Sequence, residues 1–153
     1  MAPQLEIRPL IDKLRSHALS LGVFDSCGSH EPKSVPGTGI TAALWVQRIR
    51  PSIHSGLANT AASVEFTLRA YSNFIAEPQD EIDPRLVDAI DGLIAAYTAD
   101  FTLGGAVMAI DLMGIEGTAL EATAGYVTIN QTILRVIDLT IPILLDSAWD
   151  QSP

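Results

Sequence analysis

The chain has 153 residues, of which 48% are hydrophobic and only 18% charged, and its net charge is −9. Its length suits one domain, which buries roughly 68–70% of the surface that the unfolded chain exposes. The composition excludes a disordered or low-complexity chain, and the negative charge argues against non-specific binding to nucleic-acid backbones. Because this number of charged residues is too small to cover the surface of a monomer well, part of the apolar content is expected to be buried against other chains.

Acidic charge is concentrated in the second half of the chain. Residues 1–85 hold 8 basic and 9 acidic residues, whereas 86–153 hold Arg135 alone against 9 acidic residues. We therefore expect at least one strongly negative face. The single cysteine excludes an intramolecular disulfide framework. The N-terminus has no signal-peptide pattern, and the longest apolar runs fall far short of the ~20 residues of a membrane span, which predicts a soluble protein with no membrane partner.

The first third of the chain predicts a helix, an edge strand and a loop. Apolar residues at helical spacing predict an amphipathic helix over about 9–21, which begins near Pro9 and ends at Gly22. The following segment, 23–30, is short and mixed in polarity, which fits an edge strand. Residues 31–39 contain two prolines and two glycines and predict a loop.

Two strands are predicted next. Residues 40–49 alternate with a strand period. After a loop at 51–59, residues 64–68 alternate apolar Val, Phe and Leu with Glu and Thr. This alternation is the clearest sign of a half-buried strand in the chain.

The second half predicts a helix followed by three strands. An acidic turn region, 76–84, ends in Asp83 as a helix N-cap and Pro84 at the first helical position, so a helix is expected over about 84–99. The remaining apolar runs predict strands over about 107–113, 121–129 and 133–143, the last two joined through the two-residue turn Asn130–Gln131.

This order of elements, with short late connections and no internal repeat, predicts a single α+β domain over residues 1–153. We expect an antiparallel or mixed sheet with the two main helices packed on one face.

A catalytic site is not expected from the motifs. A cysteine nucleophile needs a histidine within reach, and Cys27 and His30 are close in sequence. They lie three apart on a predicted strand, however, so their side chains should point to opposite faces. A core cysteine beside a loop histidine is the simpler interpretation.

Metal and cofactor motifs are also lacking, so no metal, cofactor or enzymatic activity is expected. The three histidines His17, His30 and His54 have no paired ligand spacing. Asp80, Glu81 and Asp83 fit a solvated turn and a helix cap better than a calcium loop. The glycine pairs at Gly37/Gly39 and Gly104/Gly105 match no nucleotide-binding fingerprint and fit turns.

Three groups of residues are candidates for contacts with other chains. Trp45, Arg48 and Arg50 place an aromatic ring and two cations on one strand, and both residue types are enriched at interfaces. A second candidate is the loop at 30–35, and a third is the apolar loop after the second helix. Ordinary core packing remains the alternative for each. The complete candidate set is His30, Glu31, Lys33, Val35, Trp45, Arg48, Arg50, Phe101 and Leu103.

An ordered series of short segments extends from about residue 9 to residue 149 and resembles the tail terminator proteins of long-tailed phages, particularly those of actinobacterial hosts. No single segment is diagnostic, and the ordered set is moderately specific. The segments are Gly22–Asp25, His30–Lys33, Pro36–Gly37, Pro51 with Ser55–Leu57, Glu77–Asp80, Ile82–Pro84, Asp100–Gly105, Ile110–Gly114 and Ala124–Tyr126.

The resemblance implies a small α+β subunit of a homo-hexameric ring at the head-proximal end of the tail tube. Such a ring stops growth of the tube protein, meets the head-completion proteins and lets genomic DNA pass without specific binding. It implies a virion protein made in the host cytoplasm. Relatives often carry a basic residue where this chain has Met108–Ala109, so any subunit contact made by that residue is in doubt here.

Two further expectations accompany this interpretation. A ring subunit needs two different apolar patches, and acidic residues that line the lumen would repel DNA phosphates. A head–tail connector or tail-completion subunit is the nearest alternative. A small hydrolase using Cys27 and His30, or a small-molecule-binding domain with an apolar pocket, are the alternatives of other classes.

Overall fold

The computed structural model describes residues 5–29, 39–53, 55, 59–73 and 82–150. In this part of the chain two helices and a six-stranded mixed sheet form an α+β fold, which confirms the predicted class. The sheet order is β1-β2-β3-β6-β4, and β5 pairs with β6 beside β4. The elements are α1 (Ile7–Ser20), β1 (Ser26–Gly28), β2 (Ile40–Pro51), β3 (Asn59–Asn73), α2 (Ile82–Ala99), β4 (Ala109–Ile110), β5 (Glu121–Ile129) and β6 (Thr132–Asp150).

The centre of the sheet is the antiparallel pair β3 and β6. Their ladder runs from Asn59 opposite Asp150 to Asn73 opposite Leu134, with one irregularity near Thr60. Both strands are longer than predicted. The expectation of a half-buried strand was wrong for β3, because Glu65 is buried on one face just as Phe66 is on the other.

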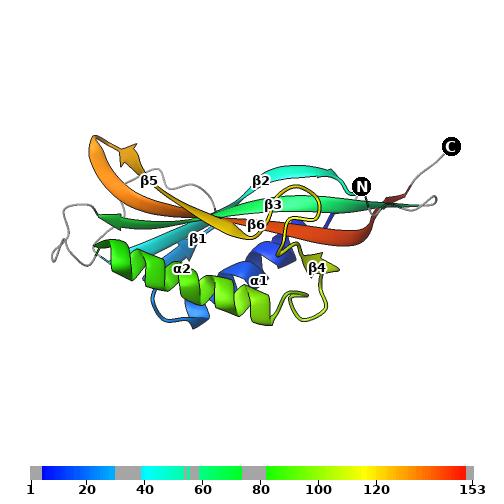
Figure 1. Cartoon of the computed structure of the whole chain (residues 1–153), viewed down its shortest axis with the longest axis horizontal. Coiled ribbons are helices and arrows are strands. Elements are labelled where there is room, and N and C mark those ends of the chain that lie inside the picture. Colours follow the sequence, from blue (N-terminus) through cyan, green and yellow to red (C-terminus); the bar gives the residue numbers. More distant parts are fainter. Residues whose placement is uncertain (1–4, 30–38, 54, 56–58, 74–81, 151–153) are drawn as a thin grey trace.

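Both helices cover the same face of the sheet, as predicted (Figure 1). They pack buried apolar residues against the inward-facing side chains of β2, β3 and β6, and form one continuous core with them. The Tyr97 hydroxyl of α2 donates a buried hydrogen bond of 2.8 Å to the Leu14 carbonyl of α1, which joins the helices to each other. Burial raises the pKa of Tyr97 far above its ordinary value, so this hydroxyl stays protonated and able to donate.

The predicted boundaries of the first helix hold to within a few residues. It begins at Ile7, so Pro9 lies in the first turn, where its missing N–H removes no helical hydrogen bond. Gly22 follows the end with a φ of +73°, the left-handed conformation that glycine adopts most easily. The expected edge strand at 23–30 is present as β1, which pairs in parallel with β2.

The last strands differ in length from their predictions. β5 matches its predicted range, whereas β6 continues to Asp150 and β4 is reduced to two residues. The turn Asn130–Gln131 is confirmed, with φ values of +49° and +67°. Positive φ at both central residues is the signature of the type I′ hairpin turn, whose twist matches that of its strands.

The predicted loop at 31–39 and acidic turn at 76–84 lie largely outside the described residues. Among the residues that are described, no helix is long and apolar enough to cross a membrane.

The packing of α2 on the sheet generates a stability prediction. Leu93→Ala removes a fully buried side chain from this helix and should lower the free energy of unfolding by about 2–5 kcal/mol, the usual cost of such a core truncation. Val87→Ala, on the exposed side of the same helix, should change it by less than about 0.5 kcal/mol. Denaturant titration of both variants checks this, and equal losses would contradict the described orientation of α2.

Candidate interaction surface

The loop that connects β4 to β5, residues 111–120, crosses the face of the sheet opposite the helices, here called the outer face. It starts beside β6, where the Asp111 amide donates to the Pro142 carbonyl at 2.8 Å. It then reaches Arg50 and Ser52 at the end of β2, on the far side of β3. Figure 1 shows it above the sheet, with both helices below. We refer to it as the outer loop.

A buried carboxylate organises the outer loop. Asp111 is 4% exposed, and its two oxygens accept hydrogen bonds from the Ile115 and Glu116 amides at 2.9 and 3.0 Å. Gly114 lies between them with a φ of +75°, and a Cβ there would come within 3.0 Å of the Ala119 nitrogen. This turn therefore depends on an aspartate that can accept two amides and on a glycine that leaves room for the returning chain.

The far end of the outer loop is attached to β2 through Glu116. The Glu116 carboxylate accepts from the Ser52 hydroxyl at 2.8 Å and from the Ile53 amide at 2.9 Å. Its carbonyl accepts from Arg50 Nη2 at 2.6 Å. These charge-assisted bonds are stronger than neutral ones, and together they fix the loop to the sheet at both ends.

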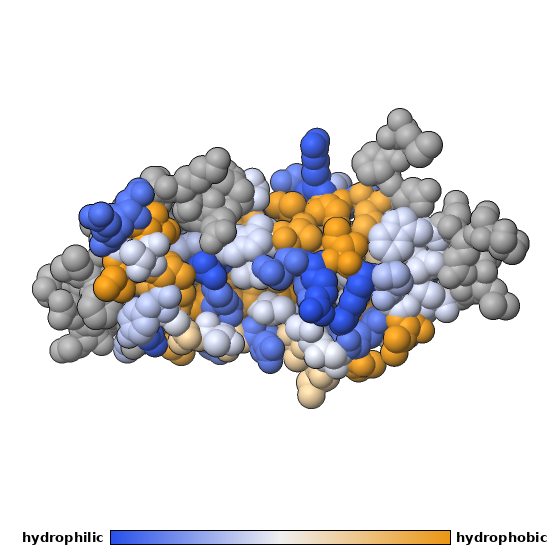
Figure 2. Space-filling view, turned by 90° about the horizontal axis from the view of Figure 1, so that it is seen from above, coloured by the Kyte–Doolittle hydropathy of each residue, from blue (hydrophilic) through white to orange (hydrophobic). Residues whose placement is uncertain are grey.

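This fixed loop holds large apolar side chains in water. Met113 is 84% exposed and Ile115 is 72% exposed, and Ile53, bonded to Glu116, is 77% exposed. We call Met113 and Ile115 the apolar knob. Figure 2 looks onto this face and shows hydrophobic side chains beside strongly hydrophilic ones. Apolar side chains that are exposed together on an ordered backbone are typical of protein interaction sites.

Two charged pairs also lie on the outer face, which carries in addition a small buried cluster of Ala43, Tyr71, Leu134 and Val136. Arg69 makes two bonds of 2.6 and 2.9 Å to the Asp138 carboxylate, and its guanidinium lies 5.3 Å from the Trp45 ring centre. The bonds to Asp138 raise the pKa of Arg69 further above its ordinary value. The second pair is Arg48 with the buried Glu65, at 3.5 Å. Cross-strand neighbours thus neutralise one another on a face that no helix covers.

The structure places the predicted contact residues differently. Trp45, Arg48 and Arg50 do lie together at the β2 side of the outer face, and the Arg48 side chain is 55% exposed. Phe101 is exposed as expected. The expectation for Leu103 is corrected, because this residue packs fully in the core and offers no surface. The loop candidates His30, Glu31, Lys33 and Val35 lie outside the described residues.

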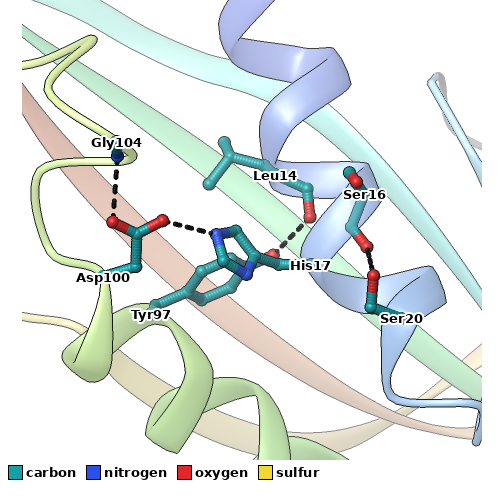
Figure 3. Close-up of polar contacts among 7 residues, drawn as sticks. All are labelled: Leu14, Ser16, His17, Ser20, Tyr97, Asp100 and Gly104. Carbon is teal, nitrogen blue, oxygen red and sulfur yellow. Dashed lines mark hydrogen bonds and ion pairs between the residues drawn. The ribbon is translucent and has the colours of Figure 1, made fainter.

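A second polar cluster joins α1 to the turn after α2. His17 Nε2 lies 2.9 Å from one Asp100 oxygen, and the Gly104 amide donates to the other at 2.9 Å. Figure 3 shows the imidazole turned toward Asp100, away from the contact between Ser16 and Ser20. A cavity of about 260 Å³ lies beside this cluster, and His17 and Asp100 are part of its lining. Both Asp100 oxygens are already engaged, one by His17 and the other by the Gly104 amide. This arrangement suits a structural connection between the helices.

The structure also locates the remaining candidates for chemistry. Cys27 is buried in the core, where desolvation raises the pKa of its thiol, so the nucleophilic thiolate is disfavoured. Within the described ranges, no three His, Cys, Asp or Glu side chains converge as a metal site would require. His30, His54, Asp80 and Glu81 fall outside those ranges.

Sequence reasoning missed the outer loop. Residues 107–113 were expected to continue as a strand, and nothing local indicates that Glu116 bonds to residues more than sixty positions earlier. A usable signal was nonetheless present in Asp111, Gly114 and Gly117, because an aspartate followed by glycines three and six positions later favours a turn.

No family model matches this sequence, and no curated protein matches it either.

The role of the buried carboxylate in the outer loop can be measured. Asp111→Ala leaves the Ile115 and Glu116 amides without their acceptor, which should lower the free energy of unfolding by about 2 kcal/mol. Amide hydrogen exchange should rise across residues 112–120 while α1 and α2 stay protected. Glu121→Ala, at an exposed position just after the loop, is the control. Unchanged exchange in the loop would contradict this role.

The Asp100 cluster gives a pH prediction. The Gly104 amide, and next His17, hold the pKa of Asp100 below its ordinary value of 3.8. The charged form therefore stabilises the fold above that value, and this stability is lost as the pH falls through the lowered folded-state pKa. Asp100→Asn should be less stable than the native chain at about pH 6, and the difference should shrink toward about pH 2. Urea titrations across this range test it, with Asp12→Asn, an exposed change on α1, as control.

Proposed function

We propose that this protein is a structural virion subunit of the tail-terminator type, which forms a ring on the head-proximal end of a phage tail tube and stops its polymerisation. The ordered series of segments that resembles that family supports the proposal, as does the α+β fold that the resemblance implies. On this hypothesis the protein works by contact alone, with itself, the tube protein and the head-completion proteins.

The observation that carries the proposal is the rigid presentation of the apolar knob. Met113 is 84% exposed on a loop that Asp111 and Glu116 fix in place, and this exposure of an apolar side chain does not stabilise an isolated monomer. A partner that covers Met113 buries its apolar surface, which favours binding. No entropy is lost in ordering the loop, because the loop is already ordered. Such preorganisation is expected of a subunit whose function is assembly.

The charge distribution fits the passage of DNA through such a ring. The second half of the chain carries 9 acidic residues against Arg135, and Arg135 lies over the Tyr126 ring, 4.6 Å from its centre. Identical subunits around an axis repeat this excess of negative charge. Where it borders the bore, it repels phosphates and leaves DNA free to slide.

Assembly of the purified protein tests the proposal. We expect sixfold rings in negative-stain images and, by light scattering, a mass that fits six copies. Added to polymerising tail-tube subunits from the same phage, the protein should bind one end of each tube and shorten the tubes. A monomer that leaves tube growth unchanged would sink the proposal, and rings that bind the portal side instead would favour the connector alternative.

Arg50→Glu should weaken ring formation. The substitution replaces the donor to the Glu116 carbonyl with a like charge beside the Glu116 carboxylate, and so displaces the outer loop. We expect loss of rings at concentrations where the native chain forms them, with unchanged helical circular dichroism. Arg85→Glu, an equal charge reversal at an exposed site on α2, should leave ring formation intact. Rings of normal stability in the Arg50 variant would remove the outer loop from the subunit contact.

A further inference from the structure

Strand β5 forms one edge of the sheet. Its nine residues pair with β6 alone among the described strands, in a ladder that runs from Glu121 opposite Thr140 to Ile129 opposite Thr132 without a register shift. Alternate N–H and C=O groups of an edge strand point away from its one partner. β5 therefore offers a regular row of hydrogen-bonding groups that no other described strand uses.

This edge lacks the features that keep the edges of natural sheets from pairing. Such edges are protected by charged side chains, prolines, bulges or a covering helix. The segment Glu121–Ile129 contains one charged residue, Glu121 at its first position, and no proline. Along it only Gly125, Val127 and Ile129 are partly buried, and Figure 1 shows the β5–β6 hairpin curling away from both helices. An exposed edge of this kind is suited to receive a strand of another chain.

We propose that β5 pairs in antiparallel orientation with β5 of a second copy of the chain, about a twofold axis at its central residue, Gly125. A pair of strands gains stability from further strands beside it, and the second copy supplies them. The inference goes beyond the proposed ring and does not depend on it.

The single charge of β5 selects the antiparallel orientation. In this pairing Glu121 lies opposite Ile129 of the second copy. The two Glu121 carboxylates are then separated by the whole length of the strand, roughly 26 Å at about 3.3 Å per residue. In a parallel, in-register pairing the same two carboxylates would be neighbours and would repel each other.

The side chains that this pairing brings together are complementary in size. Tyr126, which is 57% exposed, comes opposite Ala124 of the second copy, whose small side chain leaves room for the ring. Thr123 comes opposite Val127, a pair of β-branched residues that suits a sheet. At the axis Gly125 meets itself, so no side chain holds the two backbones apart. A second copy thus supplies, in reverse order, the small residues that face the large ones, which makes it the fitting occupant of this edge.

The symmetry of the contact places it before ring assembly. A twofold contact is complete with two copies, and it cannot recur between neighbours that are related by a single rotation axis. Association of six copies depends on a higher power of the concentration than association of two, so rings replace dimers as the concentration rises. Until then the dimer covers an edge that would otherwise be open to aggregation.

Cysteine cross-linking tests the position of the axis. A Cβ added at Gly125 meets no atom within 4 Å, so Gly125→Cys fits the monomer, and in the dimer it places two Cβ atoms within about 5 Å of each other. Oxidation should therefore give a linked dimer on a non-reducing gel. The matched control is Ala122→Cys, exposed on the same strand, whose two copies would lie roughly 20 Å apart. This control should stay unlinked, as should the native chain, whose Cys27 is buried.

A charge at the axis gives a second measurement. Gly125→Lys places two cations side by side in the dimer and should raise its dissociation constant by roughly tenfold or more, as measured by sedimentation equilibrium. Ala122→Lys makes the same change in net charge away from the axis and should leave the constant nearly unchanged. Circular dichroism should show that both variants keep the native fold.

The possible outcomes separate this inference from the proposed function. A native chain that is monomeric at every concentration below ring formation would overturn the β5 contact and leave the ring proposal standing. Equal cross-linking of the Gly125→Cys and Ala122→Cys chains, or an unchanged dissociation constant for Gly125→Lys, would do the same. Dimers that depend on Gly125, in a chain that forms no rings, would support the β5 contact and overturn the ring.

Discussion

The antiparallel pairing of β3 with β6 is the constraint on which the rest of the structure depends. Because side chains alternate along a strand, this register sends Phe66 and Ile141 to the helices and sends Glu65, Arg69 and Asp138 to the outer face. A slip of one residue would exchange the two sets, so that the core would be exposed and the charges buried under the helices. Arg69 stands directly opposite Asp138, as Arg48 stands opposite Glu65 on the neighbouring pair. The charged pairs therefore specify the same register that the apolar core requires.

The outer face needs a cover that tolerates charge. Each helix packs its apolar side against the apolar face of the sheet. The opposite face carries ion pairs in its middle, and an apolar helix surface packed there would bury these charges. The outer loop meets this requirement with polar groups, since Glu116 meets Ser52 and Arg50 at the β2 end. Met113 and Ile115 are consequently left facing water, whereas Leu112 and Leu120 of the same loop pack against the core. The exposed knob thus follows from the charge on the sheet beneath it.

Local signals in the sequence were sufficient for the helices, for β5 and for the turn Asn130–Gln131, because each depends on apolar period or turn chemistry over a few neighbouring residues. They failed where the decisive partner is distant. Glu65 was expected to face solvent because the alternation of residues along a strand shows only which side chains are polar. Its burial depends on neighbouring elements whose positions cannot be read from the sequence. β4 ends early because Asp111 turns its carboxylate to amides in its own loop. Most of the outer loop was hidden for the same reason, whereas the proximity of Trp45, Arg48 and Arg50 could be predicted because they share one strand; their role as contact residues stays a prediction.

Fixing a loop to two strands of the sheet has a mechanical consequence for the proposed ring. A closed ring requires the same angle at every contact, and a contact element on a mobile loop would permit several angles and several closures. The outer loop is attached to β6 at Pro142 and to β2 at Arg50, Ser52 and Ile53, so its position is set by strands that the β3–β6 ladder already holds in register. The direction in which the knob points is then as constant as the sheet itself. Under the proposed function, the register of the strands therefore sets the geometry of assembly.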